Sequence, residues 1–268
     1  MKRRAVRRCH GPLLAWRLVR APPDKVSAPF FPSGAEWINV ATLRLDQQLG
    51  RPVLVEFWDF CRANSLRTLG YMQRWHARYA AAGLRVISVH AGAYPPSQDA
   101  EQVRAAVARL GISHPVLLDS DFALWQEYGN EAWPARYLFD LRLRLFSMHY
   151  GEGGYDETES EICELLGVQA PQFEPLRAED APGALVGRPT AEQAGAWSGP
   201  YVAGAVWAVL EPLGTAGFVC VNGRSVAVEH AGCVQLVEHE RHATGVLKLE
   251  LGDDVVCHAV QFTAGLIG

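Results

Sequence analysis

The chain of 268 residues has few cysteines, and no two of its six cysteines are separated by two residues. This pattern excludes a Cys-x-x-Cys dithiol centre and a zinc ribbon, and six cysteines are too few for a disulfide scaffold at this length. We therefore expect free thiols in a reducing compartment and, with them, a cytoplasmic location. The cysteines stand at positions 9, 61, 163, 220, 233 and 257.

Long apolar runs are missing as well. No stretch approaches the length of a membrane span, so we expect no transmembrane segment. The apolar run at 12–16 is too short for a signal peptide and is closed by Arg17. The arginine pairs at 3–4 and 7–8 lack the apolar region that a twin-arginine signal requires, so an export signal is not predicted.

Charge is distributed unevenly. Residues 1–26 contain eight Lys or Arg and one acidic residue, whereas the rest of the chain is acidic. A basic tail can bind nucleic acid or an anionic membrane surface, but we interpret residues 1–27 as a disordered tail and expect no nucleic-acid partner. The overall composition, 49% hydrophobic and 20% charged, is that of a globular protein long enough for two domains.

Residues 28–167 predict an α/β domain. The segment 53–58 is almost wholly apolar, as expected of a strand covered on both faces, and a helical period over 65–82 is stopped by Gly83. A second buried strand over 84–90 completes a βαβ unit. The remaining predicted elements are a helix over 99–110, a strand over 116–119, a helix over 121–128 capped by Ser120 or Asp121, a hairpin of 135–140 with 143–149, and a helix over 157–166 with an Asp156–Glu159 capping box.

The rest of the chain has a different character. Residues 168–199 contain four prolines and no sustained period, which predicts a linker or an extended wrap. Residues 200–268 alternate with a period of two and predict a small all-β sandwich or jelly roll. Six strands are expected over 205–211, 217–221, 225–229, 234–239, 245–251 and 255–263, and Asn222-Gly223 predicts a tight turn between the second and third.

Several short motifs in residues 28–167 resemble one known family. They are Phe57-Trp58, Asn64, Leu66-Arg-Thr-Leu69, Val89-His90, Tyr128-Gly-Asn130, Trp133-Pro-Ala135, Tyr137-Leu138 and Gly151-Glu-Gly-Gly-Tyr-Asp-Glu-Thr-Glu159. Together they are similar to the soluble, TlpA-like region of DipZ-type thiol:disulfide reductases, a domain that is usually extracytoplasmic and is followed by a small β-sandwich. The resemblance implies a thioredoxin-like fold and a role in redox homeostasis.

In that family a Cys-x-x-Cys stands at the start of the first long helix, where the helix dipole lowers a thiol pKa. Here the resemblance places Arg62 and Ser65 at the two cysteine positions, in a turn that also contains Trp58 and Asn64. Cys61 lies one residue too early, and Ser65 cannot form a disulfide. Cys61 is the candidate catalytic or sensing thiol because Arg62 could favour its thiolate; the alternative is a cysteine packed at the strand end.

The resemblance also implies a substrate groove. It predicts a cis peptide bond before Pro134, where Trp133 and Pro134 would hold an extended partner by backbone hydrogen bonds. An ordinary edge-strand proline is the alternative. Glu152 is the third groove candidate, and we expect its carboxylate to pair with Arg62 or Arg136.

The C-terminal strands carry weak candidates for a metal site. His239 and His242 are separated by two residues, but His-x-x-His at a strand end lacks the geometry of a helical zinc pair. Exposed polar edges are the alternative, so no metal is assigned. Trp197, Tyr201 and Trp207 fit either a sugar-stacking platform or interdomain packing.

From the sequence we therefore expect a thioredoxin-like protein without the dithiol, which binds or senses a protein or peptide thiol partner and needs no cofactor. One alternative is an active oxidoreductase or peroxidase that uses Cys61 alone. The other is a metal- or carbohydrate-binding module in the C-terminal strands. The oligomeric state is left open.

Overall fold

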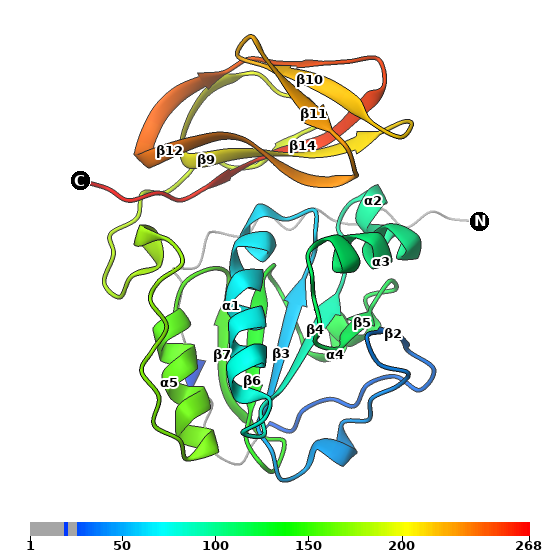
Figure 1. Cartoon of the computed structure of the whole chain (residues 1–268), viewed down its shortest axis with the longest axis vertical. Coiled ribbons are helices and arrows are strands. Elements are labelled where there is room, and N and C mark those ends of the chain that lie inside the picture. The colour runs from blue at the N-terminus through cyan, green and yellow to red at the C-terminus, as the bar shows by residue number, and fades with distance from the viewer. Residues whose placement is uncertain (1–18, 21–25) are drawn as a thin grey trace.

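The computed structural model describes residues 19–20 and 26–268, which form an α/β region (residues 26–167) with a β-region (residues 193–268) stacked on one end of it (Figure 1). The α/β region has one seven-stranded sheet in the order β1-β7-β6-β3-β4-β5-β2. β4 runs parallel to both β3 and β5, whereas the other neighbouring strands are antiparallel. This mixed sheet flanked by helices confirms the predicted α/β architecture.

The predicted elements are present in the expected order, and β1, β2 and α2 are short additions to them. The strands of the sheet are β1 Val19–Arg20, β2 Glu36–Ile38, β3 Val53–Trp58, β4 Arg85–His90, β5 Val116–Leu118, β6 Ala135–Phe139 and β7 Leu145–Tyr150. The helices are α1 Ala63–Tyr79, α2 Pro95–Gln98, α3 Ala100–Arg109, α4 Ala123–Glu127 and α5 Tyr155–Leu166, with a 3-10 turn η1 at Asp46–Gln48.

Most of the predicted basic tail, residues 1–18 and 21–25, lies outside the described residues. Within it, Val19–Arg20 pairs with β7 as an edge strand, and Ser27 bridges Arg144 farther along the same edge. Part of the segment predicted to be disordered therefore extends the sheet. No helix in the described part of the chain is both long enough and apolar enough to cross a membrane.

β3 is buried along its whole length, as its apolar sequence predicts. Side chains alternate along a strand, so Val55 and Phe57 face the core beside α4, whereas Leu54 faces α1 and α5. On that second face Trp75 of α1 fills the space against the sheet. The two cores fix the end of β3, and with it the turn that leads into α1.

Two predicted helix caps are wrong in detail. α5 begins after Gly154, whose backbone is left-handed (φ 59°), and no capping side chain bonds its first turn. Glu159 is instead buried and accepts a hydrogen bond from the Tyr79 hydroxyl (2.6 Å), so it cannot complete a capping box with Asp156. In α4 the buried Asp119 accepts from two backbone N–H groups of the first turn, in addition to the one that Asp121 accepts.

Residues 168–192 wrap along the outside of α1 and α5. Phe173 and Leu176 pack against the core under these helices. A 3-10 turn, η2 Ala178–Asp180, brings the Asp180 carboxylate to the Tyr71 hydroxyl (2.9 Å). Of the two sequence-based alternatives, the extended wrap therefore describes this segment.

The β-region contains two antiparallel sheets that share one hydrophobic core. One sheet has the order β11-β10-β13 and the other β12-β9-β14-β8. The strands are β8 Gln193–Ala194, β9 Gly199–Pro212, β10 Gly217–Val221, β11 Arg224–Val228, β12 Gly232–Leu247, β13 Leu249–Leu251 and β14 Val255–Thr263.

The predicted strands of this region are present with shifted boundaries. The turn at Asn222-Gly223 is confirmed, because both residues have positive φ and Val221 pairs directly with Arg224. The expected strands over 234–239 and 245–251 are largely one long strand, β12, whose register shifts between Glu238 and Ala243. β8, which pairs with β14, comes from the segment predicted to be a linker.

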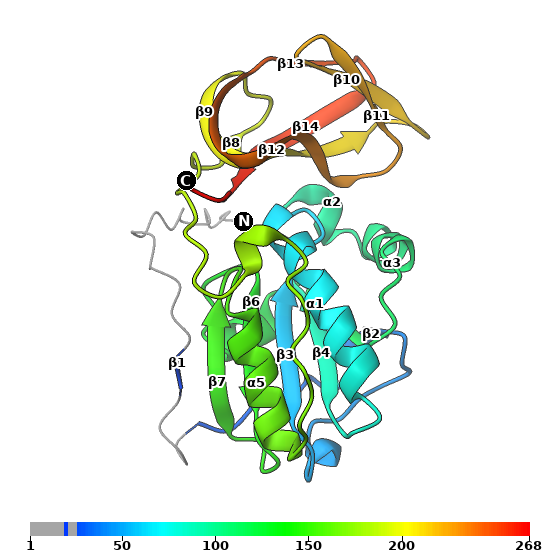
Figure 2. The ribbon, with the colours of Figure 1, turned by 60° about the vertical axis from the view of Figure 1, so that its left-hand side comes forward.

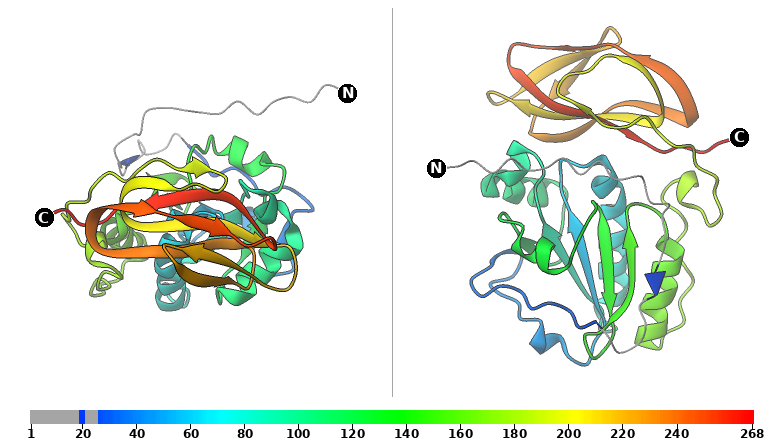
Figure 3. Two further views of the ribbon diagram at one scale, coloured as in Figure 1. Left: turned by 90° about the horizontal axis from the view of Figure 1, so that it is seen from above. Right: turned by 180° about the vertical axis from the view of Figure 1, so that it is seen from behind.

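The β-region covers the end of the α/β region where β3 stops and α1 starts (Figures 1 and 2). The strands β9, β12 and β14 lie nearest to that end, and the view from behind shows the same stacking (Figure 3). Val209 and Ala259 join Phe60 in one hydrophobic cluster, and the Cys233 N–H donates to the Phe60 carbonyl (3.3 Å). The turn before α1 is therefore an interface between the two regions.

Candidate functional site

The turn between β3 and α1 is organised by the buried carboxylate of Asp59. This carboxylate accepts hydrogen bonds from the backbone N–H groups of Cys61 (2.7 Å) and Ala93 (2.8 Å) and from the Ser97 hydroxyl (3.2 Å). Burial raises the pKa of Asp59, while the hydrogen bonds from these donors favour the charged form and oppose the rise. The turn is thereby tied to the loop that follows β4.

Ser65 and Arg62, assigned to the two cysteine positions, face different surroundings. Ser65 is buried, and its hydroxyl accepts a hydrogen bond from the Asp59 N–H (3.3 Å). Arg62 is the N-cap residue of α1 and has an extended backbone, so its side chain leaves the helix and forms an ion pair with Glu192 (2.5 Å). Asn64, in the first turn of α1, is half-buried.

The Arg62 guanidinium also contacts two aromatic rings. Its central carbon lies 4.9 Å from the centre of the Tyr94 ring and 5.0 Å from that of the Trp133 ring. Both distances fall within the range of cation–π attraction. Trp133 is itself fixed, because its indole N–H donates to the Ala91 carbonyl (2.8 Å). Arg62 is thus a positioned cation rather than a freely moving surface side chain.

Cys61, the candidate reactive thiol, is fully buried. Burial is the largest cause that raises the pKa of this thiol, and the nearby Asp59 and Cys233 raise it further. Arg62 was expected to favour the thiolate, and its charge does lower the pKa of Cys61. This is the smallest of the contributions to that pKa, however, so the net shift is upward. In this arrangement the Cys61 sulfur is neither exposed nor activated.

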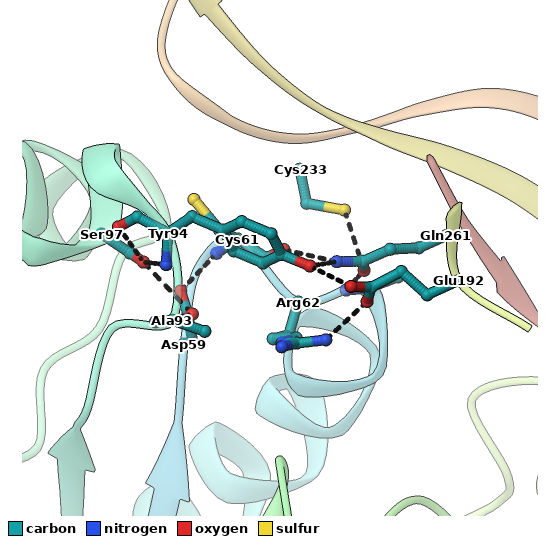
Figure 4. A network of polar contacts seen from close by, with 10 residues as sticks. Asp59, Cys61, Arg62, Ala93, Tyr94, Ser97, Glu192, Cys233 and Gln261 are labelled. Carbon is teal, nitrogen blue, oxygen red and sulfur yellow. Dashed lines mark hydrogen bonds and ion pairs between the residues drawn. The ribbon is translucent and has the colours of Figure 1, made fainter. Parts of the chain in front are cut away.

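Gln261, which the sequence did not indicate, lies directly over the start of α1 (Figure 4). From β14 its side-chain oxygen accepts a hydrogen bond from the Ala63 N–H (2.9 Å), and its amide nitrogen donates to the Cys61 carbonyl and the Tyr94 hydroxyl (both 3.0 Å). A helix start has backbone N–H groups without partners within the helix. The β-region therefore supplies one of the missing partners from outside.

The Tyr94 hydroxyl connects this amide to the ion pair, since it donates to the second carboxylate oxygen of Glu192 (2.7 Å). Figure 4 shows the resulting chain of contacts from the turn, through the loop after β4, to the segment before β8. Three parts of the molecule that lie far apart in sequence are thus held together by polar contacts.

A cavity of about 550 Å³ lies beside this network. One wall is the α/β wall, to which Arg62, Asn64 and Trp133 belong, and the other is the β wall, which contains Glu192 and Gln261. The complete lining is Arg62, Asn64, Trp133, Glu152, residues 186–192, Gln261, Phe262 and Ala264. The structure therefore brings most of the predicted turn and groove residues together around one space.

The structure tests two predictions about these residues, the cis peptide bond and the partner of Glu152. The peptide bond between Trp133 and Pro134 is cis, as expected. Glu152 lines the cavity but does not pair with Arg62 or Arg136; it forms an ion pair with Arg67 (2.5 Å). The reason is geometric: Arg67 projects from α1 toward the glycine-rich loop, and it also binds Glu179 of the wrapping segment (2.8 Å).

Trp58, His239 and His242 do not line the cavity, although the His242 ring packs against Gly187, which does. Trp58 is completely buried in the cluster beneath the β-region. His239 shares a hydrogen bond with the Tyr201 hydroxyl (3.0 Å), and the backbone N–H of His242 donates to the Leu266 carbonyl (2.8 Å). Within the described residues, no group of three potential metal-ligating side chains is found.

The aromatic residues considered as a sugar platform belong largely to the core of the β-region. The Trp197 and Tyr201 rings both contact Phe262, at 5.7 and 5.6 Å between ring centres. Tyr201 is buried in the core of the β-region, and Trp197 packs partly buried against the same core. Packing within the β-region, rather than between the regions, explains these two side chains.

A buried acidic residue that the sequence did not single out lies under the α1 face of the sheet. Glu56 stands opposite Arg136 in the register of β3 and β6, and its carboxylate accepts from the Ser88 hydroxyl (3.2 Å). Burial raises the pKa of Glu56 to about 8, although Arg136 opposes the shift. Glu56 in an apolar strand was a visible signal, because a carboxylate is rarely buried without a partner.

Comparisons with known proteins agree with this architecture. No family model matches the chain. The protein DipZ of Mycobacterium bovis is 34% identical over 154 residues, which are 54% of this chain and 22% of DipZ, so the chain spans about a fifth of that relative's length. The thiol-disulfide oxidoreductase YkuV of Bacillus subtilis is 27% identical over 131 residues, 48% of this chain and 87% of YkuV.

Among solved structures, a thioredoxin-like superfamily protein aligns with a TM-score of 0.50 and 21% identity, over 55% of this chain and all of that protein. The α/β region therefore has a thioredoxin-like fold. The sequence of this domain is similar to that of DipZ at 34% identity and to that of the thiol-disulfide oxidoreductase YkuV at 27% identity.

Proposed function

We propose that this protein is a thioredoxin-like binding protein that does not exchange disulfides. The observation that carries the proposal is the state of Arg62: at the start of α1, where a dithiol would be needed, a guanidinium is held by Glu192 and by two aromatic rings. A dithiol centre needs two sulfurs, and the chain has no Cys-x-x-Cys. Its relatives' redox chemistry is therefore not carried over.

The burial of Cys61 supports the same proposal. Thiol–disulfide exchange begins with attack by a thiolate, so the sulfur must be both ionised and reachable. Cys61 has no exposed surface, and its surroundings raise its pKa. A single-thiol oxidoreductase or peroxidase centred on Cys61 would require the β-region to move away first.

The cavity beside the cis peptide bond is the proposed binding site, and its proposed ligand is an extended segment of a protein or peptide partner. The carbonyls of Ala132 and Pro134 already accept hydrogen bonds, whereas none is found for the backbone of Trp133 within the described part of the chain. A length of chain in this position can therefore pair with the main chain of Trp133. The cavity, at about 550 Å³, has room for a few residues.

We further infer that the two sheets of the β-region form a sandwich, because their inward side chains share one core. Its proposed role is structural: it forms the second wall of the cavity and closes the start of α1. A part in redox homeostasis and the cytoplasmic location expected from the sequence stay predictions.

The proposal is tested by two activity assays and one binding assay. We expect the wild-type protein to neither reduce insulin disulfides nor consume peroxide, and Cys61→Ser to behave identically in both assays. In the binding assay, immobilised wild-type protein should retain members of a library of random hexapeptides acetylated and amidated at their ends. Turnover that is present in the wild type and lost in Cys61→Ser would contradict the proposal.

A further inference from the structure

The cavity already contains one carboxylate that is supplied by the protein itself. Glu192 reaches Arg62 with one oxygen (2.5 Å) and the Tyr94 hydroxyl with the other (2.7 Å). Its side chain keeps 39% of its surface exposed, so it can turn away without unfolding its surroundings. The Glu192 contacts therefore define a carboxylate position that faces open space.

The segment that carries Glu192 is anchored independently of this side chain. The Thr190 N–H donates to the Val202 carbonyl (2.8 Å), and Gln193 pairs with Val260 in the sheet of β14. Movement of the Glu192 side chain would therefore leave the β wall in place. A ligand could take over the carboxylate position without separating the two regions.

Positive charge in the cavity is only partly used. The Arg62 side chain bonds Glu192 through one terminal nitrogen, and its Nε is buried without a partner in the described structure. Arg188, an exposed residue, lines the same cavity and has no ion-pair partner among residues 26–268. Arginine guanidiniums suit carboxylates because they offer several N–H donors in one plane.

The acidic side chains that line the cavity are, by contrast, already paired with arginines. Glu152 is neutralised by Arg67, which is only 10% exposed and also binds Glu179. Glu192 is held by Arg62. With Glu192 turned aside, the two arginines would face the space without a paired acid, so an anionic group is favoured over a cationic one.

We infer that the cavity binds an extended peptide through the carboxylate of an acidic side chain, held by Arg62 and Arg188, and that Glu192 occupies this position in the unliganded protein. This inference rests on the proposed function, because it names the chemistry of the ligand at the same site. The Glu192 carboxylate is tethered beside Arg62, so it competes with the ligand for this position and must be displaced when the ligand binds.

The test uses the same library of capped random hexapeptides, whose members carry a carboxylate only on Asp or Glu. We expect the peptides retained by the wild-type protein to be enriched in Asp or Glu at one position. For the best of these peptides, Arg188→Gln should weaken binding and Glu192→Gln should strengthen it, each by about five-fold. Exchanging the acidic residue of the peptide for its amide should remove the difference between wild type and Arg188→Gln.

Arg142→Gln is the matched control, because Arg142 is an exposed arginine in the turn between β6 and β7, outside the cavity lining. It should leave binding unchanged. Retention of peptides without acidic enrichment, or an Arg188→Gln protein that binds like the control, would overturn the carboxylate inference while the proposed function stands. If only an uncapped library is retained, a chain-terminal carboxylate is the ligand and the side-chain inference fails. If neither library is retained, both proposals fail.

Discussion

The two walls of the cavity differ in how far apart their residues lie along the chain. The α/β wall is made by a turn and a loop, Arg62 to Asn64 and Trp133, that local sequence motifs mark. The β wall presents Gln261, which bonds Cys61 across 200 positions of sequence. Local motifs can therefore locate one wall of the cavity in the sequence. The residues of the opposite wall, such as Gln261, are placed there by long-range packing.

The same comparison explains the chemistry. On the α/β wall, the cis peptide bond before Pro134 and the start of α1 are both in place, as the thioredoxin-like fold requires. On the β wall, the Gln261 side chain uses the Ala63 N–H that the helix start offers. Under the proposed function, the framework would serve as a surface for docking and binding rather than for electron transfer.

The largest effect is expected from weakening the contact between the walls at its apolar base. Phe60 is 1% exposed and lies in the cluster shared by both regions, close to the backbone at Gly232. Phe60→Ala should lower the free energy of unfolding by about 3–5 kcal/mol, because it leaves a cavity. Urea unfolding measures the loss.

Phe218→Ala is the control for size and residue type, since Phe218 is 57% exposed on β10. It should change the free energy of unfolding by less than about 0.5 kcal/mol. Equal losses for the two variants would show that the interface does not contribute to stability in the way the structure implies.

The second effect concerns a charge inside the α/β region. The pKa of Glu56 is raised to about 8, so the folded protein holds a proton that the unfolded chain releases near pH 4.5. The contribution of the protonated Glu56 carboxyl to stability is fully present below pH 4.5 and is lost as the pH rises through about 8. The free energy of unfolding falls by up to about 1.4 kcal/mol per pH unit over this range.

The measurement is the difference in unfolding free energy between wild type and Glu56→Gln across pH 4.5 to 8. Both proteins contain the buried His90 and His114, whose pKa values are lowered to about 3 and whose titration gives the opposite slope below pH 6.5. Because this effect is the same in both proteins, it cancels in the difference, which isolates Glu56. Glu56→Gln should gain stability over wild type as the pH rises. A difference that is independent of pH would contradict a protonated Glu56.

The third effect concerns the polar contact between the walls. Gln261→Leu would leave the Ala63 N–H and the Cys61 carbonyl buried without their partner, and we expect a loss of about 1–3 kcal/mol of unfolding free energy. Gln235→Leu, at an exposed position of β12, is the matched control and should be close to neutral. Chemical denaturation measures the loss of unfolding free energy in both variants, and equal losses would argue against the capping role of Gln261.

The smallest change in stability is expected from restoring a dithiol. Arg62→Cys with Ser65→Cys removes one partly exposed ion pair, worth about 1 kcal/mol or less, and the Arg62 ring contacts. It also replaces the Ser65 hydroxyl, which accepts from the Asp59 N–H, with sulfur, a weaker acceptor. We expect the new cysteines to form a disulfide but to reduce insulin slowly, because the β wall covers them. Adding Gln261→Ala should raise the turnover.

Two outcomes would contradict this prediction. Fast insulin reduction without the Gln261 change would mean that the start of α1 is open in solution. Failure of a folded double variant to form the disulfide would show that Arg62 and Ser65 do not stand at the dithiol positions.

The α/β fold was predictable because its signals are local. The apolar run of β3, the helical period of α1 and the motif around Pro134 each depend on neighbouring residues, and the structure has all three. The partner of Glu152 was predicted wrongly, since position in a loop does not specify which face of α1 the loop meets. Arg67, rather than Arg62, projects from that face.

The β wall could not be predicted by the same means. Gln261 lies in a strand between the buried Val260 and Phe262, and nothing in that local pattern distinguishes it from an ordinary polar strand residue. Glu192 comes from a segment predicted to be a linker, where charged residues are usually solvated. Both residues acquire their roles only when the two regions stack.

The most direct test of the central claim is the rate at which each cysteine of the native protein reacts with iodoacetamide at mildly alkaline pH, followed by peptide mass spectrometry. Of the five cysteines that the structure describes, Cys163 and Cys220 are half-buried and should react first, whereas Cys61 is buried under the β-region with a raised pKa and should be protected until the protein unfolds. If Cys61 instead reacts as fast as Cys220, the start of α1 is accessible and the account of a closed, non-redox site is wrong.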